Sequence, residues 1–229
     1  MHRVKFAVAA IGLLVATAGN AAELPKPYKS NATNFAYNLL FCDTPELFIQ
    51  NKGLKPEMPL YRVLHAKPAD AGAVRKIADS DKDSCTRILA YRWLGRHKQP
   101  VPPKTLLGVV IEFGSPGSLD TVAVYADGNT RYIDEQEHLF SYGPNTAGIS
   151  GKAQDFLKRS RDLLAHLDPW KEARQPAPPY GFMRITFLAS SGIYFGDGEL
   201  RQMAKDKFGG ATVHSAFDLY KAVSAITEK

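Results

Sequence analysis

Residues 106–133, LLGVVIEFGSPGSLDTVAVYADGNTRYI, constrain the fold more than any other part of the chain. An apolar run ends at Gly-Ser-Pro-Gly-Ser, and a second apolar run ends at Asp127-Gly128. Asp-Gly tolerates the positive φ of a tight hairpin, so the pattern predicts three consecutive antiparallel strands. The stretch contains no catalytic or ligand-binding motif, so it indicates an architecture without indicating an activity.

The rest of the chain predicts helices around this sheet and two further strand segments. A second hairpin is expected where FMRITFLA is followed by a Ser-Ser-Gly turn and IYFG, and one N-terminal strand is expected at residues 58–66, MPLYRVLHA. Residues 134–151 are polar and turn-rich, which predicts a surface loop. Helices are expected at about 32–42, 45–53, 68–79, 84–97, 152–167, 198–208 and 212–227. Tight turns between consecutive strands indicate an α+β fold with a mainly antiparallel sheet: the three-stranded meander, the second hairpin and the N-terminal strand, packed with helices.

Residues 1–22 have the pattern of a secretory signal peptide. A short basic region precedes an apolar run of about 13 residues, and small residues then make cleavage after Ala21 or Ala22 the expected outcome. The run is shorter than the roughly 20 residues that a membrane-spanning helix needs. We therefore expect a bacterial periplasmic or secreted protein that has no transmembrane segment after cleavage.

The chain that follows, residues 23–229, is long enough for one domain with a substantial core. A proline-rich connector, residues 99–104, is the clearest internal boundary. We therefore expect a single α+β domain, with a helical N-terminal layer over about 32–98 and a sheet-centred part over about 104–229.

Cys42 and Cys85 are the only two cysteines. An even number of cysteines in an exported chain favours a disulfide. Each lies on the apolar face of a predicted helix, so one helix interface would bring them together. Two buried free thiols are the alternative.

The basic excess is concentrated on the helical layer. Loss of the signal peptide lowers the formal net charge from +6 to +4, while residues 75–104 alone contain eight Lys or Arg against three Asp. Arg87, Arg92 and Arg96 on one predicted helix are candidates for contact with an anionic partner. A solvated helical face is the alternative. Nucleic acid is not expected as a partner, because an exported protein seldom meets it.

Two acidic residues of the meander form a weak candidate for catalysis. If Phe113 pairs with Leu119 in the first hairpin, Glu112 and Asp120 lie opposite each other on one face. Paired carboxylates shift each other's pKa and serve in acid/base chemistry. A register shifted by one residue would place them on opposite faces.

The turn Phe195-Gly-Asp-Gly-Glu-Leu200 is a candidate anion site, because it is predicted to connect a strand to a helix N-terminus. Backbone N–H groups at such an end bind anions. Asp197, next to Gly198, would alternatively cap the helix and fill that position itself.

No metal site is predicted. Asp134, Glu135, Glu137 and His138 are the densest group of possible ligands, but consecutive residues on a loop rarely converge on one ion. The histidines show no metal-binding spacing, and no nucleotide-binding loop or serine-nucleophile motif occurs. We therefore expect no cofactor.

Several blocks together resemble a family of uncharacterised bacterial proteins. They are LGVVIE, LDTVAVYADGNTRYI, a Pro-Trp pair before a proline-rich segment, and RITFLASSGIYFGDG. They cover about half of the chain. The resemblance implies that these blocks form one recurring structural unit, and it implies no activity.

Together these patterns predict an exported, non-enzymatic binding protein that contacts an anionic or protein partner in the cell envelope. The alternative is a hydrolase of envelope polymers that uses Glu112 and Asp120. A purely structural role is the third possibility.

Overall fold

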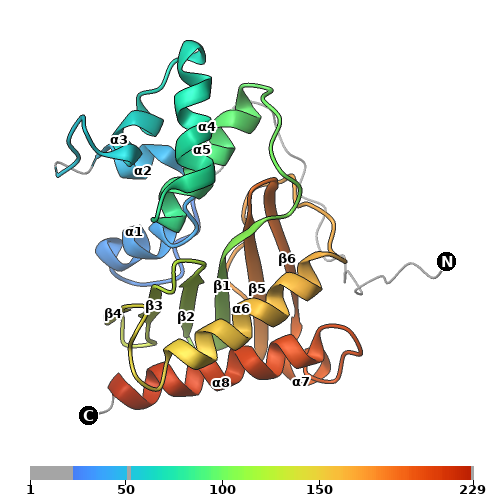
Figure 1. Ribbon diagram of the computed structural model, residues 1–229. Coiled ribbons are helices and arrows are strands. Elements are labelled where there is room, and N and C mark those ends of the chain that lie inside the picture. The colour runs from blue at the N-terminus through green and yellow to red at the C-terminus, as the bar shows by residue number, and fades with distance from the viewer. Residues whose placement is uncertain (1–22, 51–52, 228–229) are drawn as a thin grey trace.

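The computed structural model describes residues 23–50 and 53–227. Its centre is a six-stranded antiparallel sheet with the strand order β4-β3-β2-β1-β5-β6 (Figure 1). The α+β fold with an antiparallel sheet is therefore confirmed. The strands are β1 (Leu106–Ser115), β2 (Ser118–Tyr125), β3 (Thr130–Ile133), β4 (Leu139–Tyr142), β5 (Phe182–Ala189) and β6 (Gly192–Glu199). Strands β1 to β3 form the expected meander, and β5 and β6 form the expected second hairpin.

Helices pack on both faces of the sheet. In Figure 1, α6 (Ser150–Leu164) and α8 (Gly210–Thr227) cross one face, and the four-residue α7 (Leu200–Met203) follows β6. The N-terminal half supplies α1 (Asn31–Leu39), α2 (Pro45–Ile49), α3 (Pro59–Leu64), the 3₁₀ turn η1 (Pro68–Asp70), α4 (Ala71–Ser80) and α5 (Ser84–Arg96). No helix in the described ranges combines the length and the apolar character needed to cross a membrane.

The two faces of the sheet carry separate cores because side chains alternate along each strand. Val109, Ile111 and Phe113 of β1 belong to the core beneath α6 and α8. Val110 belongs to the core that β1, β2, β3 and β5 share with α1, α3, α4 and α5. Glu112 lies on this second face too, because it follows Val110 by two residues in the same strand.

The N-terminal strand predicted at residues 58–66 is wrong, since this segment contains α3. Pro59 occupies the first helical position, where its missing N–H is not needed. Val63, which is 2 % exposed, and Leu60, which packs against the same core, are three residues apart, a spacing that a helix but not a strand places on one face.

The surface loop predicted at residues 134–151 is also partly wrong, because it contains β4. This short strand pairs with β3, opposite residues 130–133. Phe140 and Tyr142 pack against the core beneath α6 and α8, while Leu139 points outward and is 52 % exposed. Four residues within a polar segment are too few for the alternation to be recognised.

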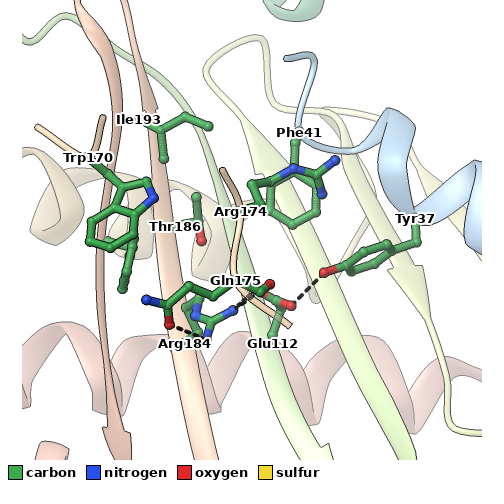
Figure 2. A pocket seen from close by; sticks show the side chains of 10 residues that line it. Tyr37, Phe41, Glu112, Trp170, Arg174, Gln175, Arg184, Thr186 and Ile193 are labelled. Atoms are coloured by element: carbon green, nitrogen blue, oxygen red, sulfur yellow. Dashed lines mark hydrogen bonds and ion pairs between the residues drawn. The ribbon is translucent and has the colours of Figure 1, made fainter. Parts of the chain in front are cut away.

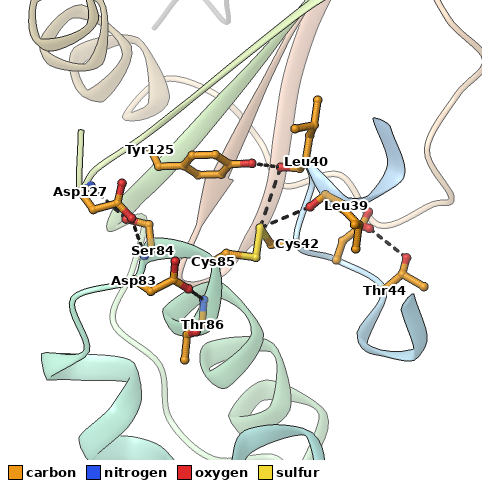
Figure 3. The surroundings of a disulfide bond; sticks show 11 residues. Leu39, Leu40, Cys42, Thr44, Asp83, Ser84, Cys85, Thr86, Tyr125 and Asp127 are labelled. Carbon is orange, nitrogen blue, oxygen red and sulfur yellow. Dashed lines mark hydrogen bonds between the residues drawn. A yellow bond between two sulfur atoms is a disulfide. The ribbon is translucent and has the colours of Figure 1, made fainter. Parts of the chain in front are cut away.

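The predicted disulfide between Cys42 and Cys85 is confirmed (Figure 3). It joins the chain just after α1 to the first turn of α5, with the two Cα atoms 5.4 Å apart. Two contacts beside it connect the helices to the meander. Ser84 and Asp127 exchange hydrogen bonds between side chain and backbone, and the Tyr125 hydroxyl donates to the Leu40 carbonyl over 2.7 Å. The disulfide therefore lies where both halves of the chain meet.

Candidate functional site

Residues 169–181, here called the strap, cross the sheet face that carries Glu112. The strap contains four prolines, which favour an extended chain and prevent helix formation. At its start the Trp170 N–H donates to the Ile193 carbonyl of β6 over 2.8 Å, and at its end the Gly181 N–H donates to the Gly114 carbonyl over 3.2 Å. A Cβ at Gly114 would lie 2.6 Å from the Pro178 carbonyl oxygen, so this approach requires glycine. The strap is thereby held close against β1 and β6.

Three charged residues lie directly opposite one another beneath the strap, on adjacent strands. Glu112 of β1 is paired in register with Arg184 of β5, which is paired with Asp197 of β6. A nitrogen of Arg184 lies 3.1 Å from the Asp197 carboxylate, but the closest approach to Glu112 is 4.0 Å. The row of alternating charges follows from the strand order and register.

Glu112 is almost completely buried, with its side chain 1 % exposed. The Tyr37 hydroxyl of α1 donates to its Oε1 over 2.7 Å. Burial raises the pKa of the Glu112 carboxyl, and Arg184, Tyr37 and Arg174 oppose that rise. The pKa of Tyr37 is also raised, mainly because its hydroxyl is buried and further because the Glu112 carboxylate is close.

Arg184 is held by the strap as well as by the strands. Its Nη1 donates to the Pro176 carbonyl over 2.8 Å and, at 3.3 Å, to that of Gln175. Its Nε is buried and has no hydrogen-bond partner among the described residues. One donor of this guanidinium therefore remains unsatisfied.

Arg174 projects from the strap toward α1 and the chain after it. Its Nε lies 2.7 Å from the Asp43 carboxylate, and its Nη2 donates to the Asn38 side chain over 2.7 Å. The guanidinium lies 4.1 Å from the centre of the Phe41 ring, a cation–π geometry. Its Nη1 is buried without a partner in the described part of the chain, as Nε of Arg184 is.

The two arginines line one small hollow with both aromatic and carboxylate groups (Figure 2). The hollow has room for about one water. Its lining includes Glu112, Trp170 and Phe195. The Trp170 and Phe195 rings meet edge to face with their centres 4.7 Å apart, and Phe195 belongs to β6. An oxygen of an anionic group matches both this lining and a space of this size.

The arginines predicted on α5 do not form one face. Arg87 and Arg96 are nine residues apart, which places them on opposite sides of a helix. Arg87 donates to the Ala78 carbonyl of α4 over 2.8 Å, whereas Arg96 is exposed. Arg92 lies on the side near Asp43, and its Nε is another buried nitrogen without a partner in the described ranges. Burial lowers the pKa of Arg92, and attraction to Asp43 opposes that effect.

The predicted pairing of Glu112 with Asp120 is wrong. The hairpin register places Glu112 opposite Thr121, one residue away from expectation. Asp120 consequently faces α8, where its Oδ1 accepts a 2.7 Å hydrogen bond from the Tyr132 hydroxyl and its Oδ2 accepts one from Tyr220. The two carboxylates therefore lie on opposite faces of the sheet and cannot act together.

The helix cap predicted at Asp197 is also wrong, because β6 continues through Asp197 and Gly198 to Glu199. The residue at the cap position of α7 is Glu199, which makes no side-chain capping bond. Asp197 instead belongs to the charged row beneath the strap, and Gly198 lies opposite Met183 of β5. The expected helix over 198–208 is reduced to the four residues of α7.

The acidic group at residues 134–138 is occupied by contacts within the protein. Asp134 accepts hydrogen bonds from the backbone and ring of His138, and Glu137 accepts them from the backbone of Lys29 and Ser30. The part of the chain that the structure describes contains no group of three or more His, Cys, Asp or Glu able to hold a metal ion.

Comparison with protein-family models, curated proteins and solved structures finds no match. The family resemblance of the sequence blocks remains a prediction. Arg174, Arg184 and Tyr37 are not among the site residues that the sequence predicts. The sequence does carry a signal for Arg184, and the same signal for Glu112, because each is the only charged residue in an apolar strand.

Proposed function

We propose that this chain is an exported, non-enzymatic binding protein that binds an anionic group of a protein or cell-envelope component at the hollow beneath the strap. The observation that carries the proposal is the pair of buried, unsatisfied donors on Arg174 and Arg184, since a buried donor left without a partner costs about 1–3 kcal/mol. Guanidinium groups favour carboxylate and phosphate oxygens, so the anionic group is of one of these two kinds.

The site of contact therefore differs from the one favoured by the sequence. Arg92 adjoins the cluster through Asp43 and Arg174, while Arg87 and Arg96 lie elsewhere on α5. The hydrolase alternative required Glu112 and Asp120 on one face, and their separation removes its support.

Anion binding is testable with acetate, inorganic phosphate and sulfate as probes, in thermal unfolding and calorimetric titrations at constant ionic strength. At least one probe should raise the unfolding temperature saturably, whereas potassium chloride should not. Arg174→Gln and Arg184→Lys should each weaken that binding at least tenfold, because each removes a guanidinium that lines the hollow.

Arg161→Gln on α6 is the matched control, since Arg161 is an exposed arginine remote from the strap. It should bind as the unsubstituted protein does. Folding of each variant is checked by circular dichroism before titration. If no probe exceeds chloride, or if folded Arg174→Gln binds normally, the proposal is wrong.

Export is supported by the signal-peptide pattern, which lies outside the described residues, and by the disulfide, since disulfides persist in oxidising compartments. Protein recovered from bacterial cells should begin at Ala22 or Glu23 and be found in the periplasmic or secreted fraction. Mass analysis without reductant should find Cys42 linked to Cys85. Recovery with Met1 intact and both thiols alkylated in the native state would contradict export.

A further inference from the structure

Glu112 has the weakest ion pair in the cluster, although it is the most deeply buried carboxylate there. Asp43 lies 2.7 Å from Arg174. Asp197, whose side chain is 39 % exposed, lies 3.1 Å from Arg184. The Glu112 carboxylate, which is 1 % exposed, is 4.0 Å from its nearest arginine nitrogen. Negative charge on Glu112 is therefore the least compensated of the three.

Charged and titratable groups reach Glu112 from every segment packed around it. They are Tyr28 before α1, Tyr37 in α1, Arg174 in the strap, Arg184 in β5 and Asp197 in β6. The arginines and Tyr37 favour the ionised form, whereas burial and the Asp197 charge favour the neutral form. Burial has the largest effect, so the pKa of Glu112 is raised in the folded protein.

We propose that Glu112 takes up a proton when an anion enters the hollow, so that anion and proton bind together. This inference rests on the proposed function. An anion in the hollow would share Arg184 with Glu112, and a second negative charge beside a buried carboxylate disfavours its ionised form. The neutral carboxyl still accepts the hydrogen bond from Tyr37 and gains an O–H that can donate to the anion. With a singly charged anion such as a carboxylate, one negative and one positive charge enter, which leaves the charge of the cluster unchanged; with sulfate, the proton offsets one of the two negative charges.

The test is the pH dependence of sulfate affinity, because sulfate keeps its charge between about pH 5 and pH 8. In the unsubstituted protein the Kd should rise by up to about tenfold per pH unit once the pH exceeds the pKa of Glu112 in the unliganded state, as uptake of one proton requires. Glu112→Gln should bind sulfate with a Kd that does not change with pH. At about pH 8 it should bind more tightly than the unsubstituted protein does.

Asp155→Asn is the matched control, because Asp155 is an exposed carboxylate on α6 that pairs with Arg159. It should keep the pH dependence. Binding that depends equally on pH in the Glu112→Gln and unsubstituted proteins would overturn the proton coupling and leave the proposed function intact. Failure of sulfate and the other probes to bind at any pH would overturn the proposed function, and the coupling with it.

A measurement without ligand tests whether Glu112 titrates in the folded protein. Because the pKa of Glu112 is raised in the folded state, its contribution to stability is full below the ordinary pKa of glutamate and is lost as the pH rises through the folded-state value. The unfolding temperature of Glu112→Gln relative to the unsubstituted protein should therefore increase with pH. A difference that stays constant with pH would contradict a titrating Glu112.

Discussion

Gly114 is the residue at which the strap and the sheet come closest. A Cβ there would meet backbone atoms of Pro178 and Pro179, which cannot rotate away as a flexible side chain can. Other glycines have free space around them, Gly72 of α4 among them. The size of residue 114 therefore controls how closely the strap covers Glu112 and Arg184.

We expect Gly114→Ala to destabilise the protein by about 1–3 kcal/mol, the usual cost of inserting a group into a packed site. The strap should also loosen, so the Trp170 amide hydrogen, bonded to the Ile193 carbonyl, should exchange faster. Urea unfolding and native-state hydrogen exchange measure the two effects.

Gly72→Ala is the control, and it should be neutral or stabilising by up to about 1 kcal/mol, since alanine favours a helix more than glycine does. A Gly114→Ala protein with normal stability and normal protection of Trp170 would show that the strap is not pressed against β1.

Segments marked by long apolar runs or clear turns could be predicted from the sequence, whereas two short segments, β4 and α3, could not. The meander and the second hairpin have long apolar runs and clear turns, which is why both predictions are confirmed. The four-residue β4 and the six-residue α3 are too short for periodicity to distinguish strand from helix.

The register of the first hairpin depended on one detail of turn geometry. Ser115 pairs with Ser118, so the turn contains only Pro116 and Gly117, and Gly117 adopts a φ of 72°. Proline followed by a glycine with positive φ suits a two-residue turn. The longer turn expected from Gly-Ser-Pro-Gly-Ser shifts the pairing by one residue, and that shift alone placed Glu112 and Asp120 on the same face.

The candidate site could be predicted only in part for a similar reason. A lone charge in an apolar strand marks Glu112 and Arg184 as buried residues that need a partner. Their pairing requires β5 to insert beside β1, a contact between strands about 70 residues apart in the chain. Arg174 joins them only because the strap folds back over the sheet, and the sequence pattern of the strap does not specify that path.

The two hydrophobic cores of the molecule share the strands of one sheet. Val109 and Ile111 of β1 belong to the core beneath α6 and α8, while Leu107 and Val110 belong to the core of the helical layer. Loss of the helices on either face would expose that face of the strands to water. The expectation of a single domain therefore implies that the helices on both faces unfold together.

We expect one cooperative unfolding transition, with coincident curves from circular dichroism, which reports on the helices, and from tryptophan fluorescence. The two tryptophans suit this test, because Trp93 packs against the core of the helical layer and Trp170 lies in the strap.

Cys42→Ser combined with Cys85→Ser should lower the free energy of unfolding by about 4 kcal/mol for a sequence separation of 43 residues, with a single transition retained. The matched control is the unsubstituted protein under reducing conditions, which should lose a similar amount. Two separated transitions in the oxidised protein, with the helical layer unfolding first, would mean that residues 23–103 and the sheet behave as independent units.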